Sequence, residues 1–467
     1  MHILRHPKGL WVLGFGKMWD TFSYFGTQTI LALYFIHIFH FNTSTSYLLY
    51  GAYAALAFST PILGGVISDK YFGSKHALIT GCIFNICGNL LLISLNRYLF
   101  CLGLSIAILG SGFYKSNSTY LVGALYEDDN LIEKESGFTW FYMLINIGGT
   151  MGPLVYGLIA YSLGWNYVFL FSALGIFTGT LWLLKNWDAI PFHAQKTPQT
   201  NTYQILTLYC FLILVIFTSS LVFYFPSAIN PVIWLLFGIG IFYLIKRIWQ
   251  YTGTSRRHLL ALFLFSFLAM FYFAAGLQTG STITVFVQSK IQEGVVKIHL
   301  PSSTFNMLYC VFVLVLTPCF TYLWARLKQK GIILALPTKL VLGIGLASIG
   351  IFIFGLSALT NYILLGTVVG YIFLSAGELV ITPTAYTALS NLSPEGIKST
   401  MMGYWLFFIA IGGYSSSLLA NGSTYIANHV ASNALHYSTI FFLIGSFTLF
   451  ISVVVLAFRN TLINMMK

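Results

Sequence analysis

Long apolar runs separated by short polar stretches dominate the chain. A helix needs about 20 mainly apolar residues to cross the hydrocarbon core of a bilayer, and these runs reach about that length or more. The pattern predicts fourteen membrane-spanning helices, an even number that places both termini on one side. They cover residues 10–39, 45–68, 76–97, 100–124, 138–163, 165–184, 203–225, 229–246, 257–288, 303–326, 337–358, 361–391, 399–420 and 436–458.

The runs fall into groups of six, two and six, and a polar stretch at 185–201 follows the first group. We expect two six-helix halves, residues 1–184 and 257–467, joined by a linker and an inserted two-helix hairpin, residues 185–256. Transporters are often built from such repeats, with the solute site near the bilayer midplane between them. The predicted fold class is an all-α polytopic membrane protein with this organisation.

Composition narrows the class further. Of the 467 residues, 57% are hydrophobic and 7% are charged, whereas a soluble chain carries about 25% charged residues. Disorder, a coiled coil, a secreted disulfide scaffold and nearly every soluble enzyme are excluded. The six cysteines lie inside apolar runs without a CxxC spacing, so we expect neither disulfides nor a metal site. No G-x-x-x-x-G-K-[ST] motif is present, which argues against an ATP-driven pump.

The formal charge of +12 would suggest a nucleic-acid partner in a soluble protein. In membrane proteins, excess Lys and Arg collects in cytoplasmic loops instead. If the N-terminus is cytoplasmic, 18 of the 23 basic residues fall in inner loops and tails, and only Arg97, Lys290 and Lys297 fall in outer loops. The bias predicts a multi-pass protein of the inner (plasma) membrane with both termini cytoplasmic and no nucleic-acid partner.

Four charged residues lie inside the predicted spans and away from their ends: Lys17, Asp20, Lys115 and Glu378. A charge at a helix centre costs about 2.5–3.5 kcal/mol on insertion scales, so such residues usually face a cavity and have partners. Lys115 lies near mid-span in the first half, and Glu378 near mid-span in the second. An ammonium facing a carboxylate suits a zwitterion, such as a short peptide, with its carboxylate toward Lys115 and its amine toward Glu378. The alternative is a static Lys–Glu bridge between the halves.

Lys17 lies only about seven residues into the first run, which leaves two possibilities. Its ammonium either snorkels to the cytoplasmic surface or pairs with Asp20 at i,i+3.

Uncharged side chains within the spans supply further candidates for substrate binding: Tyr24, Asn146, Gln278, Asn306 and Trp405. Asparagine amides can hydrogen-bond a peptide backbone, and their alternative role is an interhelical bond worth about 0.6 kcal/mol. The two aromatic residues could shape side-chain pockets. In a chain that is 17% aromatic, the alternative is ordinary packing.

Several motifs resemble those of the major facilitator superfamily. The loop that follows the second run has the superfamily's glycine, acidic and basic positions at Gly65, Asp69, Lys70 and Gly73. The three residues between Asp69 and Gly73 are one more than the general pattern, as in the proton-dependent oligopeptide transporter (POT) family. In the superfamily, this loop allows tight helix contact, and its acidic residue caps or pairs across to the other half in one conformation.

Four further stretches resemble this family over nearly the whole chain. Residues 110–117 resemble the helix 4 run GxGxFKPN, with Ser116 in place of proline, and residues 121–126 are close to LVGxLY. FTWFYMLINIGG at 138–149 resembles the helix 5 signature FYxxINxGG. Residues 377–383 and 401–405 look like helices 10 and 11. The resemblance implies that Asn146 and Asn306 bond the peptide backbone.

Helices 1 and 7 depart from the family pattern. Lys17, Asp20 and Thr21 replace the two glutamates and the arginine of E-x-x-E-R, and Gln28 replaces a later arginine. Leu277 replaces the helix 7 glutamate. In the family these groups are linked to proton coupling, and the later arginine helps to hold the peptide carboxylate. The resemblance does not carry these two functions over residue by residue.

Asp20 is nevertheless the expected proton site, with a pairing to Lys115 that alternates with protonation. The competing arrangement pairs Asp20 permanently with Lys17, and coupling is then weak.

The sequence as a whole favours a monomeric importer of short peptides or related amino-bearing solutes, driven by proton symport through alternating access and without a cofactor. Two alternatives stay open. One is a carrier of the same fold for another small solute, with weak or no proton coupling. The other is a non-transporting membrane receptor.

Overall fold

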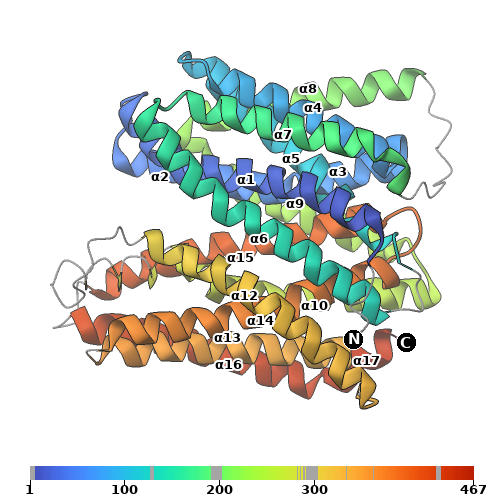
Figure 1. Ribbon diagram of the computed structural model, residues 1–467, viewed down its shortest axis with the longest axis vertical. Helices are drawn as coiled ribbons and strands as arrows, with labels where there is room; N and C mark the ends of the chain where they lie inside the picture. Colours follow the sequence, from blue (N-terminus) through green and yellow to red (C-terminus); the bar gives the residue numbers. More distant parts are fainter. Residues whose placement is uncertain are drawn as a thin grey trace. The chain divides into compact units, whose positions relative to one another are not determined.

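The computed structural model describes residues 6–126, 131–190, 202–280, 282–283, 286–287, 290, 303–332, 334–360, 362–427 and 433–466. Within these ranges the chain is helical and has no strand (Figure 1). The chain forms two compact units. Unit 1 comprises Met1–Arg256 with Leu389–Ala410, and unit 2 comprises Arg257–Ala388 with Ile411–Lys467.

Unit 1 contains the first nine α-helices and the beginning of a later one. They are α1 (Lys8–His37), α2 (Thr43–Ser59), α3 (Pro61–Ile67), α4 (Ser74–Leu92), α5 (Arg97–Gly123), α6 (Leu131–Ser162), α7 (Tyr167–Lys185), α8 (Thr202–Tyr224) and α9 (Ile229–Trp249), with the first turns of α15 (Lys398–Ala427). A π-helical turn, Ser68–Phe72, connects α3 to α4.

Local chemistry explains where several of these helices begin. The side-chain oxygen of Asn42 accepts a hydrogen bond from the Thr45 N–H, and that of Asn96 accepts one from the Tyr98 N–H. Such caps satisfy N–H groups that have no partner within the helix. The predicted run 45–68 becomes two consecutive helices because Pro61, which lacks an N–H, begins α3.

Glycines let α4 and α5 pack backbone to backbone. A Cβ at Gly88 would lie 2.4 Å from the backbone nitrogen of Ala107, and one at Gly110 would lie 2.4 Å from that of Asn85. No larger residue fits either position without moving a helix. The contact therefore holds Asn85 of α4 directly against α5, with its side chain reaching α1.

The hairpin of α8 and α9 packs on the rest of unit 1. Leu208 and Leu212 of α8 are buried in one cluster with Leu109 and Phe113 of α5. On α9, the Gly240 carbonyl accepts a hydrogen bond of 3.0 Å from the hydroxyl of Tyr404 in α15. The rings of Phe237 and Phe407 meet edge to face at 5.5 Å. The hairpin thus contacts both the first six-helix group and the beginning of α15.

Unit 2 is built from the remaining helices and most of α15. They are α10 (Gly253–Gly276), the 3-10 turn Leu277–Gly280, α12 (Ser303–Gln329), α13 (Leu336–Ala358), α14 (Ile363–Leu392), α16 (Asn433–Ala457) and α17 (Arg459–Met466). Hydroxyl groups form hydrogen bonds between several of these helices. Ser348 of α13 donates to the Gly445 carbonyl of α16 at 2.8 Å, and Tyr272 of α10 donates to the Leu374 carbonyl of α14 at 2.7 Å.

Each predicted run coincides with at least one helix. In the described part of the chain, 12 helices are long and apolar enough to cross a membrane, and their outward faces carry exposed apolar residues such as Leu158, Tyr161 and Phe242. The helix α1, which contains Lys17 and Asp20, and α15 are not among the twelve. The all-α polytopic class is therefore confirmed, while the count of fourteen spans and the three-part division of the chain stay predictions.

Candidate functional site

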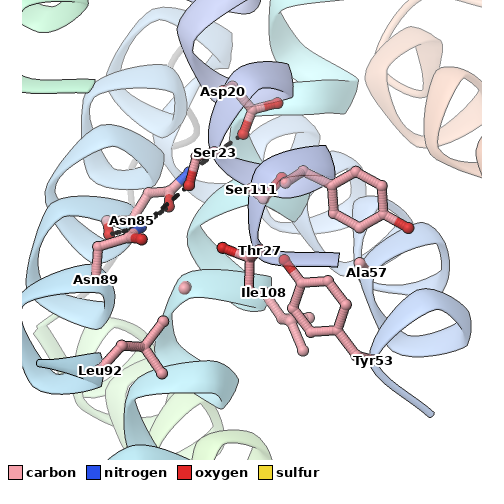
Figure 2. A pocket seen from close by; sticks show the side chains of 12 residues that line it. Asp20, Ser23, Thr27, Tyr53, Ala57, Asn85, Asn89, Leu92, Ile108 and Ser111 are labelled. Atoms are coloured by element: carbon pink, nitrogen blue, oxygen red, sulfur yellow. Dashed lines mark hydrogen bonds between the residues drawn. The ribbon is translucent and has the colours of Figure 1, made fainter. Parts of the chain in front are cut away.

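A narrow polar cavity lies among α1, α2, α4 and α5 of unit 1 (Figure 2). Its volume of about 10 Å³ is room for about one water molecule. Asp20 is the one charged residue in its lining. The lining residues are Asp20, Ser23, Tyr24, Thr27, Tyr53, Ala57, Asn85, Asn89, Leu92, Ala107, Ile108 and Ser111. The predicted proton-coupling residue therefore borders a space that can hold water.

A chain of polar contacts runs from Lys17 along one wall of this cavity. The Lys17 ammonium lies 2.8 Å from Oδ2 of Asp20, and the Asn85 amide donates to Oδ1 of Asp20 at 3.2 Å. The Asn89 amide donates to the Asn85 side-chain oxygen at 2.9 Å and to the Ser23 hydroxyl at 3.3 Å. Both oxygens of the buried carboxylate thus have donors.

This geometry decides between the two possibilities for Lys17. Its side chain is 4% exposed, so the snorkelling alternative is wrong, and the i,i+3 pairing with Asp20 is confirmed. Helix periodicity places residues three apart on one face, and the low polarity around them makes the pair more favourable than separated charges. The structure shows Asp20 with Lys17, which is the competing arrangement, rather than with Lys115.

Lys115 has a different environment. Its ammonium donates to the Ala57 carbonyl at 3.3 Å and lies 4.1 Å from the centre of the Tyr24 ring and 4.7 Å from that of Phe58. Among the described residues of unit 1, no carboxylate lies within 4.0 Å of it. Cation–π contacts stabilise a desolvated ammonium by about 2 kcal/mol without neutralising it. Lys115 is therefore a buried cation whose charge is available to an anion.

Tyr24 connects this cation to the cavity. Its ring is stacked on that of Tyr53 of α2 at 5.4 Å, and its buried hydroxyl has no hydrogen-bond partner in the part of the chain that the structure describes. The Ser111 hydroxyl and the side-chain oxygen of Asn89, both lining the cavity, are likewise without a described partner. Buried polar atoms of this kind usually bind an ordered water. The cavity offers both the space and the partners for one.

Asn146 and Trp405 also belong to unit 1. Asn146 is buried in α6, and its amide donates to the Tyr142 carbonyl one turn earlier in the same helix, at 2.9 Å. Trp405 is fully buried in the first turns of α15. Neither lines the polar cavity, so their predicted contact with a solute stays a prediction.

The other candidates lie in unit 2. Glu378 is buried in α14 and interacts electrostatically with Tyr386 of the same helix. The Gln278 amide donates to the carbonyls of Ala274 and Ser416, and its oxygen accepts from Thr282 at 2.7 Å. The side chain of Asn306 lies outside the described residues. Lys115 and Glu378 belong to different units, so the predicted pairing of their charges across one cavity stays a prediction.

The loop motif contacts the beginning of α15 within unit 1. The Asp69 carboxylate accepts hydrogen bonds from the backbone N–H and the hydroxyl of Thr400, at 2.8 and 2.7 Å. Thr400 is in the first turn of α15, where a negative charge satisfies free N–H groups and complements the helix dipole. A Cβ at Gly65 would lie 2.4 Å from the Ser399 carbonyl oxygen, so only glycine permits this approach.

The rest of the loop motif sets the geometry of this contact. Gly73 has a φ of +71°, a left-handed conformation that favours glycine, and it ends the π-helical turn before α4. Lys70 is exposed. The residues of the sequence motif therefore act together: Asp69, Gly65 and Gly73 position α3 and α4 against the start of α15.

A second polar cluster joins the segment before α1 to α6. Nδ1 of His6 lies 3.0 Å from the Tyr126 hydroxyl, and Nε2 lies 3.3 Å from the Ser136 hydroxyl. Burial lowers the pKa of His6 below its ordinary value of 6.5, and the nearby Glu133 carboxylate opposes this shift. Burial also raises the pKa of Tyr126.

The sequence analysis missed Asn85 and Asn89. Both occur in an apolar run, where each asparagine alone is typical of an interhelical bond. Their spacing of four residues places them on one face of α4, and this was the available signal. Which helix that face meets depends on the packing of α4 against α5 and α1, and a single sequence does not reveal it.

Buried charges inside an apolar helical protein, together with a helix cap between separated parts of the chain, are typical of a polytopic membrane transport protein. The POT family profile matches residues 75–440. The chain belongs to this family, which confirms the resemblance drawn from its motifs.

Curated relatives match almost end to end. The chain is 24% identical to the dipeptide and tripeptide permease B of Salmonella typhimurium (strain LT2), over 99% of this chain and 97% of that protein. It is 26% identical to an uncharacterized transporter, YclF, of Bacillus subtilis (strain 168), over 86% and 85% of the two chains. It is 23% identical to the dipeptide and tripeptide permease B of Edwardsiella piscicida, over 90% and 88%.

Solved structures share the fold. A POT family transporter in complex with a thioalcohol-conjugated peptide matches with a TM-score of 0.77 and 21% identity, covering 98% of each chain. A POT family transporter in complex with 5-aminolevulinic acid matches with a TM-score of 0.76 and 21% identity, again over 98% of each chain. The chain therefore shares the fold of POT family transporters, as the sequence predicted.

Proposed function

We propose that this protein is a secondary transporter that imports short peptides, or related amino-bearing solutes, by proton symport and alternating access. It acts as a monomer in the inner (plasma) membrane, with both termini cytoplasmic and no cofactor other than the coupling proton. Two of the relatives named above are dipeptide and tripeptide permeases, and two similar structures hold a peptide conjugate and an amino acid. Both kinds of similarity support a solute with a free amine and a carboxylate.

The observation that carries this proposal is the environment of Lys115. A buried ammonium held over two aromatic rings, with no carboxylate beside it among the described residues of unit 1, is a site for the carboxylate of a solute. Charge-assisted hydrogen bonds of this kind are shorter and stronger than neutral ones. The buried carboxylate of Glu378 supplies the complementary group for the solute's amine.

The contact of Asp69 with Thr400 supports alternating access. Two hydrogen bonds and a backbone approach at Gly65 hold the beginning of α15 against α3 and α4. A transporter that opens on this side must break these contacts, and it can form them again when that side closes. The loop thus contributes to a two-state equilibrium that solute and protons can bias.

One observation favours a second candidate, a carrier of the same fold with weak or no proton coupling. Asp20 is already paired with Lys17 and hydrogen-bonded to Asn85. Loss of the carboxylate charge would therefore weaken both contacts.

Uptake by purified protein in proteoliposomes tests the proposal. Vesicles loaded with unlabelled dipeptide should accumulate labelled dipeptide by counterflow, and an inward proton gradient alone should drive accumulation when the membrane potential is clamped with potassium and valinomycin. Counterflow without gradient-driven accumulation would favour the weakly coupled carrier. The absence of both, with substrate binding retained, would favour the receptor. Competition by dipeptides, tripeptides and free amino acids then defines the solute.

A further inference from the structure

Asp20 lies within electrostatic reach of two buried ammonium groups. Lys17 forms an ion pair with it at 2.8 Å, and Lys115 interacts with it electrostatically at longer range. Tyr53, Tyr114 and Cys82 also interact with Asp20, but all three are normally uncharged at neutral pH. A single carboxylate can neutralise only one of the two lysines, so the surroundings of the carboxylate must determine which lysine it pairs with.

Asn85 fixes the orientation of the carboxylate. Its amide donates to Oδ1 of Asp20 at 3.2 Å, which leaves Oδ2 directed at Lys17. A rotation of the carboxylate away from Lys17 would lose this hydrogen bond. Asn85 is 4% exposed, and no other described side-chain donor besides Lys17 and Asn85 is recorded at the Asp20 carboxylate.

Asn85 is in turn held on both sides. The Asn89 amide donates to the side-chain oxygen of Asn85 at 2.9 Å, which leaves the NH2 group of Asn85 to face Asp20. On the opposite side, the close approach of Gly110 fixes the Asn85 backbone against α5. Figure 2 shows the resulting line of side chains from Asp20 through Asn85 to Asn89.

We propose that Asn85, oriented by Asn89, is a positioning residue that commits Asp20 to Lys17 and so keeps the Lys115 charge available to the carboxylate of a solute. The pair of Lys17 and Asp20 is then a neutral unit within α1. Lys115 is then a buried cation with no carboxylate partner among the described residues, and it selects solutes that carry an anionic group. This inference rests on the proposed function, because it assigns Lys115 to the solute.

The test is a rescue experiment on counterflow exchange in proteoliposomes, which needs no net proton movement and so remains measurable in variants of Asp20. Asn85→Leu keeps the side-chain volume and removes the donor, so Asp20 divides its time between the two lysines. The KM for a dipeptide with a free carboxylate should rise about ten-fold, the scale of one charge-assisted hydrogen bond. The KM for the same dipeptide with a C-terminal amide should not change. Adding Asp20→Asn to Asn85→Leu removes the competitor for Lys115 and should restore the affinity for the free acid.

Two controls separate positioning from general damage. Thr139→Val also replaces a buried polar group of unit 1 by a hydrocarbon, and its hydroxyl donates to the Glu135 carbonyl of its own helix, so both KM values should stay as in the wild type. Asn89→Leu releases the orientation of Asn85 and should raise the KM for the free acid less than Asn85→Leu does. If Asn85→Leu fails to fold, the KM of Asn89→Leu for the free acid provides the test instead. An unchanged KM in Asn85→Leu, or no rescue by Asp20→Asn, would overturn the inference.

Failure of the proposed function can be distinguished from failure of this inference. If the wild type transports neither peptide, the proposed function is wrong, and the reactivity of Lys115 then tests the inference directly. Carbamylation of Lys115 by cyanate, followed by mass spectrometry, should be about ten-fold slower in Asn85→Leu, because an ion-paired amine loses its proton less readily. It should return to the wild-type rate in the double variant. Equal rates in all three proteins would contradict the inference.

Discussion

Three charged side chains buried in α1 and α5 of unit 1 have two different environments. Lys17 and Asp20 neutralise each other at 2.8 Å, while Lys115 is stabilised by aromatic faces and a carbonyl. The difference follows from position along the helices. Lys17 is one turn from Asp20 on α1, whereas Lys115 is on α5, where Tyr24 and Phe58 lie over its ammonium. Charge count alone would not separate these environments.

Asp20→Asn tests proton coupling at this position. Only a carboxylate can take up and release the coupling proton there, so we expect the variant to lose accumulation driven by a proton gradient. Counterflow exchange, which needs no net proton movement, should continue. Both are measured with labelled dipeptide in proteoliposomes. Accumulation that persists in Asp20→Asn would show that Asp20 is not the coupling group, and it would favour the weakly coupled carrier.

Glu378→Gln tests the site for the solute's amine. The amide keeps the shape of the side chain but replaces a charge with a weak dipole. A hydrogen bond to a charged group is worth about 1.5–3 kcal/mol, so affinity for peptides with a free amine should fall roughly ten- to a hundred-fold. The affinity for N-acetylated peptides should fall much less. Equal affinity of the variant and the wild type for every peptide would remove Glu378 from the site.

We expect the contribution of His6 to the stability of the folded protein to depend on pH. Burial lowers its pKa below the ordinary value of 6.5, so the folded protein favours the neutral ring. The stability that His6 contributes is fully present above about pH 6.5 and is lost as pH falls through the lower, folded-state pKa. The melting temperature of the wild type should exceed that of His6→Ala at about pH 8, and the two should converge near pH 5. A difference that grows on acidification would contradict this sign.

At the scale of helices, the capping of α15 by Asp69 connects distant parts of the sequence. Asp69→Ala leaves the first turn of α15 without its acceptor, a loss of about 1 kcal/mol for a typical cap. In a background without other cysteines, a cysteine at Ser399 should then react with a thiol reagent about five-fold faster. Asp188→Ala removes another carboxylate of unit 1 and should leave the rate unchanged. Equal rates in Asp69→Ala and the wild type would show that the cap does not protect the beginning of α15 from the reagent.

The helices were the most predictable part of the structure. Apolar length gave their approximate bounds, whereas the break between α2 and α3 at Pro61 was not predicted, because 45–68 was expected to be one run. The i,i+3 pair of Lys17 and Asp20 was also accessible, because it lies within one helix. The roles of Asn85 and Asn89 were not, because they depend on how far α4 is rotated against α1. The hydrogen bond from Tyr404 to Gly240 joins α15 to α9, and no local pattern predicts such a contact.

At the scale of the whole molecule, the charge bias of the loops gives a topology that can be measured. Single cysteines at residues 97 and 290, placed in a background without other cysteines, should react with an impermeant thiol reagent added outside intact cells. A cysteine at Lys70, which is exposed in the loop before α4, should react only after the cells are opened. Reaction of residue 97 or residue 290 only after the cells are opened would reject the predicted orientation.

The aromatic setting of Lys115 has an optical consequence. A cation 4.1 Å from the centre of the Tyr24 ring imposes a strong local electric field on that phenol, and the field shifts the near-ultraviolet absorption of the ring. A bound anion that draws the ammonium aside would weaken the field and move the band. Occupancy of the site would then be visible as a difference spectrum without any label, and Tyr24→Phe would abolish it. The absorption of Tyr24 would in this way report whether the site is occupied.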